Sequence, residues 1–129
     1  MRITKVLMGS FEKIDSIQFF LSDGLVEHTG KAVGDRTFNH EYNVPVNDEI
    51  KCIRFGIDFY QDYWQFASMQ FITKNNVESQ VYSGTNPVSQ YQTLCLPGND
   101  DHLVGFHGHY GTGTFDSIGF DIMTEKFQP

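Results

Sequence analysis

Three short segments of the chain share one pattern, and this repeat limits the folds that the sequence can adopt. The segments are "IDSIQF" (residues 14–19), "FASMQF" (residues 66–71) and "FDSIGF" (residues 115–120). In each copy apolar residues recur at every second position, which is typical of a β-strand with one buried face. The copies start roughly fifty residues apart, which is the scale of a supersecondary repeat.

The repeat extends upstream of these segments. Each copy follows an apolar stretch that ends in glycine: "ITKVLMG", "IKCIRFG" and "HLVGFHG". The repeating unit is therefore a strand, a glycine-marked turn and a second strand, and three such hairpins anchor three sheets. No window of the sequence keeps a helical period, so helix should be nearly absent. A threefold all-β unit closes either as a trefoil or as a prism of three sheets, with one core filled by the three inward faces.

Composition supports one folded domain over residues 1–129. A chain of this length buries a substantial core without metals or a disulfide framework. Ser16, Ser68 and Ser117 share one offset in the repeat, on the side opposite the apolar residues, where we expect them to face solvent. The two cysteines, Cys52 and Cys95, are too few for a disulfide framework and are predicted to be buried thiols.

Charge and hydropathy exclude several kinds of partner. The formal net charge is −7 and the basic residues are scattered, so nucleic acid and anionic membrane surfaces are disfavoured. No apolar run is long enough to insert into a membrane, and no secretion signal is visible, so a complete chain would be cytoplasmic.

The last repeat carries a resemblance to a known family. The run "VGFHGHYGTGTFDSIGF", together with "FASMQFITKN", "VYSG" and "YQTLCLPG" upstream, resembles the jacalin-related lectins. This resemblance covers nearly the whole chain and implies a β-prism of three Greek-key, four-stranded sheets with pseudo-threefold symmetry. It also implies a carbohydrate-binding protein that recognises mannose-type or galactose-type glycans, with no metal, no cofactor and no enzymatic activity.

The resemblance implies where the sugar would bind. In the family the main site is the loop between the last two strands, where an aspartate carboxylate and main-chain N–H groups take the sugar hydroxyls. In this sequence the corresponding residues are Gly111, Thr112, Gly113, Thr114, Phe115 and Asp116, with Tyr110 and Asn86 as secondary candidates. Asp116 is the expected acceptor, and its alternative interpretation is a local cap of turn amides like its repeat equivalent Asp15. Phe115 has an alternative place in the core, because Ile14 and Phe66 occupy the same repeat position.

Two departures from the family pattern bear on this expectation. The stretch "GTGTFD" reaches its aspartate one residue later than in the family, which can reshape or close the pocket. Family members also begin with a glycine-rich strand ahead of "ITKV", and the first strand is therefore expected to be missing here. One sheet would then have an unpaired edge, which favours either a homodimer through that edge or pairing with a segment of a larger parent protein.

Other interpretations remain open at the level of sequence. His107 and His109 lie at i and i+2, near His102, but no third metal ligand is evident. The sequence has no pair of convergent carboxylates and no nucleophile motif, which argues against catalysis. The aromatic stretch "DFYQDYWQF" (residues 58–66) predicts a contact loop for a partner. The alternative to a lectin is therefore a protein-interaction or attachment module that keeps the fold and has lost the sugar site.

Overall fold

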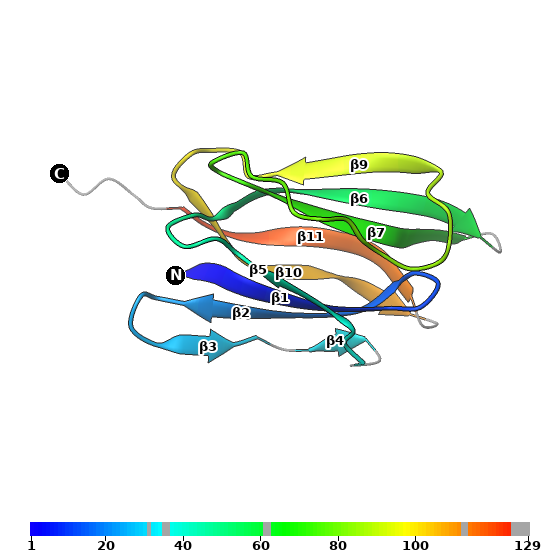
Figure 1. Cartoon of the computed structure of the whole chain (residues 1–129), viewed down its shortest axis with the longest axis horizontal. Helices are drawn as coiled ribbons and strands as arrows, with labels where there is room; N and C mark the ends of the chain where they lie inside the picture. Colours follow the sequence, from blue (N-terminus) through cyan, green and yellow to red (C-terminus); the bar gives the residue numbers. More distant parts are fainter. Residues whose placement is uncertain (31, 35–36, 61–62, 112–113, 125–129) are drawn as a thin grey trace.

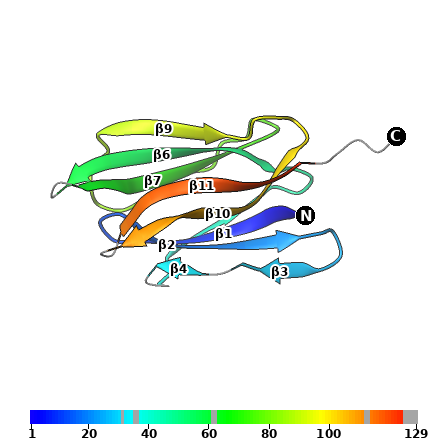
Figure 2. The ribbon, with the colours of Figure 1, turned by 180° about the vertical axis from the view of Figure 1, so that it is seen from behind.

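The computed structural model describes residues 1–30, 32–34, 37–60, 63–111 and 114–124. In this part of the chain all regular elements are β-strands, which confirms the all-β prediction. Accordingly, it contains no helix that is long and apolar enough to cross a membrane. The strands form three antiparallel sheets, seen from opposite sides in Figures 1 and 2.

The first sheet is built on the hairpin of β1 (Arg2–Ser10) and β2 (Ile14–Ser22). The outer edge of β2 pairs with β3 (Glu27–Thr29) and β4 (Val33–Gly34), and the outer edge of β1 pairs with β5 (His40–Asn43). The order is therefore outer, inner, inner, outer, with β3 and β4 sharing one outer position.

The second sheet repeats this order. Its inner hairpin consists of β6 (Ile50–Tyr60) and β7 (Tyr63–Thr73). The short strand β8 (Tyr82–Ser83) pairs with β7, and β9 (Gln90–Cys95) pairs with β6. In both sheets the residues that follow the inner hairpin supply its outer strands.

The third sheet differs from the other two. It consists of β10 (Asp101–Gly111) and β11 (Thr114–Thr124), and within the described ranges neither strand has an outer partner. The expected four strand positions are therefore present in two of the three sheets, and the third has two strands among the described residues. An unpaired edge was expected, and both edges of the hairpin are unpaired in the described part of the chain.

The three inner hairpins share their irregularities as well as their sequence. Each hairpin contains two β-bulges, one near its open end and one near its turn. The residues without a direct partner are Thr4, Lys51 and Val104 at the first bulge, and Asp15, Ala67 and Asp116 at the second. Because bulges twist and bend a hairpin, their recurrence gives the three units the same curvature around one core.

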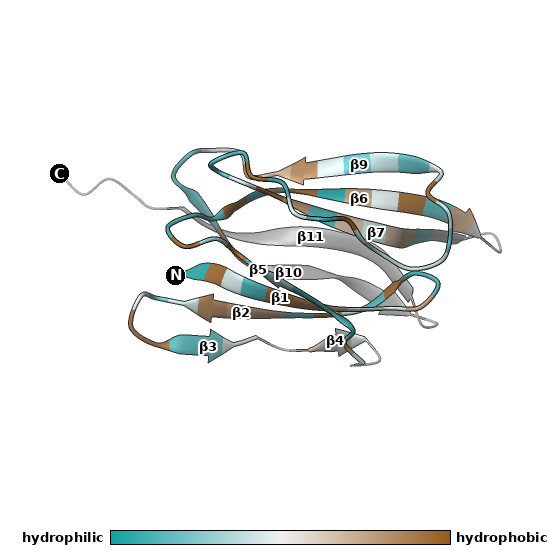
Figure 3. Cartoon of the chain, in the orientation of Figure 1, coloured by the Kyte–Doolittle hydropathy of each residue, from teal (hydrophilic) through white to brown (hydrophobic). Residues whose placement is uncertain are grey.

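The core contains side chains from all three units. Its described members include Val6, Met8, Ile14, Ile17, Ile53, Phe55, Met69, Phe71 and Leu103. The Tyr42 ring stacks on Phe71 with centroids 4.4 Å apart, and Phe19 meets Phe106 edge-on at 5.8 Å, which joins the first sheet to the third. Figure 3 shows the contrast between the hydrophilic outer strand β3 and the more hydrophobic inner strand β2.

The prediction that the repeat serines face solvent is wrong for the two whose burial is described. Ser16 is 0 % exposed and Ser68 is 2 % exposed. Each stands opposite a glycine, Gly9 or Gly56, and a connecting segment crosses over the pair. A methyl group on Gly9 would collide with the main-chain carbonyl of Thr37. The small residues therefore make room for the chain that leads to the outer strands.

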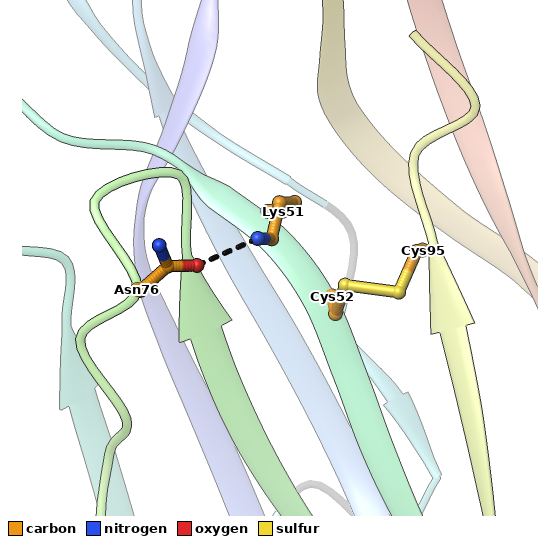
Figure 4. The surroundings of a disulfide bond; sticks show 4 residues. All are labelled: Lys51, Cys52, Asn76 and Cys95. Atoms are coloured by element: carbon orange, nitrogen blue, oxygen red, sulfur yellow. Dashed lines mark hydrogen bonds between the residues drawn. A yellow bond between two sulfur atoms is a disulfide. The ribbon is translucent and has the colours of Figure 1, made fainter. Parts of the chain in front are cut away.

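The prediction of two buried thiols is also wrong. Cys52 on β6 and Cys95 on β9 form a disulfide, because these residues are direct partners across the two strands. Figure 4 shows the bond beside the hydrogen bond from Lys51 Nζ to Asn76 Oδ1. The disulfide fixes the end of the outer strand β9 to the inner hairpin of the second sheet.

Candidate functional site

The hairpin of β10 and β11 contains the predicted site, and the structure describes part of it. Tyr110 pairs with Phe115 and Gly111 pairs with Thr114, so the described strands pair up to these last two residues. Thr112 and Gly113, which lie between them in the sequence, are outside the described residues. For Gly111, Thr114, Phe115 and Asp116 the structure describes the main chain.

The extra residue in "GTGTFD" has a visible place in this hairpin. In the first unit the strands pair up to Ser10 and Ile14 and are closed by three residues. In the third unit the equivalent pair is Tyr110 and Phe115, and one further pair, Gly111 and Thr114, follows it. The additional residue therefore lengthens the strand ladder by one pair and leaves the bulge near the turn in its place.

Asp116 is the residue at this bulge. His109 pairs with Ser117 and Tyr110 pairs with Phe115, which leaves Asp116 without a direct partner in the ladder. Its equivalent in the first unit, Asp15, is 8 % exposed and accepts a hydrogen bond from the hydroxyl of Ser16 at 3.4 Å. Bulges recur next to binding sites because they redirect a side chain. The buried position of Asp15 agrees with a structural role in the first unit.

The loop that contains Asn86 packs on the turn of the first hairpin. The N–H of Thr85 donates to Phe11 O at 2.8 Å, and the N–H of Asn86 donates to Glu12 O at 2.9 Å. A methyl group on Gly84 would collide with the main chain of Glu12, so the approach is close. The side-chain nitrogen of Asn86 is buried and has no hydrogen-bond partner within the described structure. Asn86 is therefore a predicted site residue with a buried donor that no described group accepts from.

The aromatic stretch of the second unit forms strands instead of a loop. Phe59 pairs with Trp64 and Tyr60 pairs with Tyr63, so β6 and β7 continue well past their bulge at Ala67. All three inner hairpins close at the same end of the molecule, and this one extends beyond the other two (Figure 1). The side chain of Phe59 is 51 % exposed there. The candidate sugar hairpin and an exposed aromatic residue therefore share one end.

A charged cluster lies at the opposite end, and sequence reasoning did not find it. Glu49 Oε2 accepts a hydrogen bond from His102 Nδ1 at 2.6 Å and lies 3.3 Å from Lys74 Nζ. Burial by itself would raise the pKa of Glu49, but the bonds from His102 and the Lys74 ammonium hold it below the usual 4.5. Three distant parts of the sequence meet here, so no local pattern indicates the contact.

This cluster does not form a metal site. No group of three or more potential metal ligands occurs among the residues that the structure describes. His102 is engaged with Glu49, and the side chains of His107 and His109 lie outside the described set. A small pocket of about 170 Å³ at this end is lined by Met1, Arg2, Ser22, Asp23, Gly24, Glu49 and His102.

Sequence comparison assigns nearly all of the chain to one kind of domain. The Jacalin-like lectin domain matches residues 1–121, which includes the whole of β1 to β10 and most of β11. A search of curated protein sequences gives no significant match.

Solved structures of the same architecture agree with this assignment at low sequence identity. Artocarpin bound to mannopentose superposes with a TM-score of 0.75 and 15 % identity, over 95 % of this chain and 84 % of artocarpin. A galactose-specific lectin from Artocarpus hirsuta, bound to methyl-α-D-galactose, gives 0.74 and 15 %, over 95 % and 92 % of the two chains. Malaysian banana lectin gives 0.72 and 18 %, over 96 % and 84 %. These likenesses establish the fold.

Proposed function

Because the chain belongs to the jacalin-like lectin family, we propose that it binds hexoses of the mannose or galactose type through the β10–β11 hairpin. The proposed residues are Gly111, Thr112, Gly113, Thr114, Phe115 and Asp116, with Tyr110 beside them. The observation that carries the proposal is the position of Asp116 at the bulge near the closed end of the β10–β11 hairpin. The related structures were solved with sugars of both types, so they do not favour one.

The chemistry of these residues suits a sugar ring without a metal ion. Adjacent hydroxyl groups of a hexose donate to an ionised carboxylate, and such charge-assisted bonds are stronger than neutral ones. Glycines on both sides of Thr112 allow the main chain to approach the ligand closely. The equivalent carboxylate of Asp15 is buried in the first unit, whereas the second unit has Ala67, so the fold does not require an acid at this bulge.

Asn86 is a candidate for a second contact with the glycan. Its buried, unpartnered amide nitrogen lies in a loop that is fixed to the first turn by two main-chain hydrogen bonds. A buried donor without a partner costs about 1–3 kcal/mol, so a rotation of the Asn86 side chain toward a hydroxyl of a longer glycan would be favourable.

A glycan array probed with three proteins tests the proposal. The wild type should bind a coherent set of mannose-containing or galactose-containing glycans, and Asp116→Asn should lose at least tenfold in affinity. Asp100→Asn serves as the matched control, because Asp100 is exposed and lies before β10, away from the turn. Thermal melting of all three proteins confirms folding. A folded Asp116→Asn protein with wild-type binding would remove the proposed site.

The second candidate function is a protein-interaction module, and one observation favours it. The β6–β7 hairpin extends beyond its neighbours and exposes Phe59, and an exposed aromatic side chain on a projecting hairpin is a typical contact residue of protein interfaces. A folded wild-type protein that binds no glycan at high concentration would support this candidate over the lectin.

A further inference from the structure

The inner strands of the third sheet are long and, among the residues that the structure describes, they have no outer neighbours like those of the other inner strands. β10 and β11 each contain 11 residues, as do β6 and β7. The strands at the outer edges of the other two sheets are short, between 2 residues in β8 and 6 in β9. Short outer strands protect a sheet against pairing with another chain, whereas a long open edge invites it. The third sheet is therefore built like the interior of a wider sheet.

The two open edges differ in charge. Residues 99–124 contain no lysine, arginine or proline, which are the residues that usually protect an edge strand. β11 carries two aspartates, Asp116 and Asp121. β10 carries one, Asp101, which is buried and accepts a hydrogen bond from the N–H of Gly98 at 2.7 Å. Self-pairing would bring like charges together along β11 but not along β10.

We propose that two copies of this chain pair antiparallel along β10. The paired hairpins then form one shared sheet in the order β11, β10, β10 of the partner, β11 of the partner. This sheet has four strands, which is the number of strand positions across each of the other two sheets. An antiparallel contact between identical strands is two-fold symmetric and closes on itself, so it gives a discrete dimer.

This arrangement has a consequence for ligand binding. Each β10 ends at the turn that carries the proposed sugar residues, and antiparallel pairing places the two turns at opposite ends of the shared sheet. A strand of this length spans about 36 Å at roughly 3.3 Å per residue. The dimer would therefore hold its two sites apart and facing away from each other.

Light scattering coupled to size-exclusion chromatography tests the dimer. The molar mass of the wild type should be twice the 14.8 kDa of one chain, and the fraction of monomer should grow on dilution. His107→Glu/His109→Glu places acidic side chains along β10 and should shift the protein to monomer at concentrations where the wild type is dimeric. Gln90→Glu/Gln92→Glu is the matched control, since it makes the same spacing and charge on β9, the exposed outer strand of the second sheet. The control should remain dimeric.

Hydrogen exchange of the β10 peptide provides a second measurement that does not depend on a variant. Its amides should be more protected in concentrated than in dilute wild-type protein, whereas β9 should not change. A wild type that is monomeric at high concentration overturns the proposal. So does a dimer that survives the β10 variant and is lost in the β9 control. A monomer whose β10 edge is already fully protected also overturns it, because another segment or protein then covers that edge.

Discussion

At the scale of single residues, the clearest electrostatic feature is the carboxylate of Glu49 at the end opposite the candidate site. Its pKa lies below the usual 4.5 in the folded protein because His102 and Lys74 outweigh the effect of burial. A depressed carboxylate pKa stabilises the fold at pH values above the unfolded pKa. This stabilisation is lost as the pH falls through the folded pKa.

The variant Glu49→Gln should reveal this contribution. At pH 7 we expect it to lower the free energy of unfolding by about 1–2 kcal/mol, because hydrogen bonds to a charged group are replaced by neutral ones. As the pH falls below 4.5 and through the lowered pKa of Glu49, the wild type should lose this advantage, and the two unfolding free energies should converge. Urea denaturation over this pH range measures both values. A difference between the two proteins that stays constant with pH would contradict the prediction.

The alternation of apolar residues in the repeat predicted the buried apolar residues but not the burial of the serines between them. The alternation of the repeat correctly placed Met69 and Phe71 in the core, but it assigned Ser16 and Ser68 to solvent. These two serines are buried because connecting segments cross the outer face of the first two inner hairpins. Those segments are irregular and polar, so no periodic signal in the sequence indicates that they cover anything.

At the scale of elements, the disulfide adds a covalent link to an outer strand that otherwise depends on its ladder with β6 and on Leu94, which packs against the core. The residues of β9 are almost all exposed. The strand contacts β6 largely through the ladder, the disulfide and the guanidinium of Arg54, whose Cζ lies 4.6 Å from the centroid of the Tyr91 ring. The cysteines are 43 positions apart in sequence and meet only because β9 returns to pair with β6. Their pairing therefore depends on strand order, which spacing alone does not reveal.

Reduction of the disulfide should destabilise the protein by about 3–4 kcal/mol, the value expected for a closed loop of this length. Cys95 is exposed, so a reductant can reach the bond. Thermal melting with and without dithiothreitol measures the loss, and the double variant Cys52→Ala/Cys95→Ala should be insensitive to the reductant. An equal melting temperature for the wild type in both conditions would contradict the prediction. Disulfides persist mainly in oxidising environments and are rare in cytoplasmic proteins, so this bond does not support the expectation of a cytoplasmic protein.

At the scale of the whole molecule, the repeat in the sequence was enough to predict three hairpins around one core. The family resemblance resolved the choice between a trefoil and a prism, since both satisfy the same periodicity. What periodicity did not predict is the difference between the sheets. Outer strands such as β3 and β8 have 3 and 2 residues, too few for a periodic signal, and their pairing depends on the path of the chain.

The combination of one sugar site per chain with pairing along β10 leads to the last prediction. Sites at opposite ends of a shared sheet cannot bind two sugars of one small glycan, but they can connect two separate glycan-bearing surfaces. The wild type should therefore aggregate beads coated with a glycan that it binds, and free sugar in excess should disperse them. Avidity of this kind requires both sites in one particle.

Two variants separate the contributions of the site and the dimer. His107→Glu/His109→Glu should coat the beads without aggregating them, because a monomer with an intact site binds one surface at a time. Asp116→Asn should do neither, although it should remain dimeric. Turbidity reports aggregation, and fluorescence of labelled protein on the beads reports binding. If the monomeric β10 variant still aggregated the beads, each chain would have to carry a second sugar site, and the loop around Asn86 would be the first place to look for it.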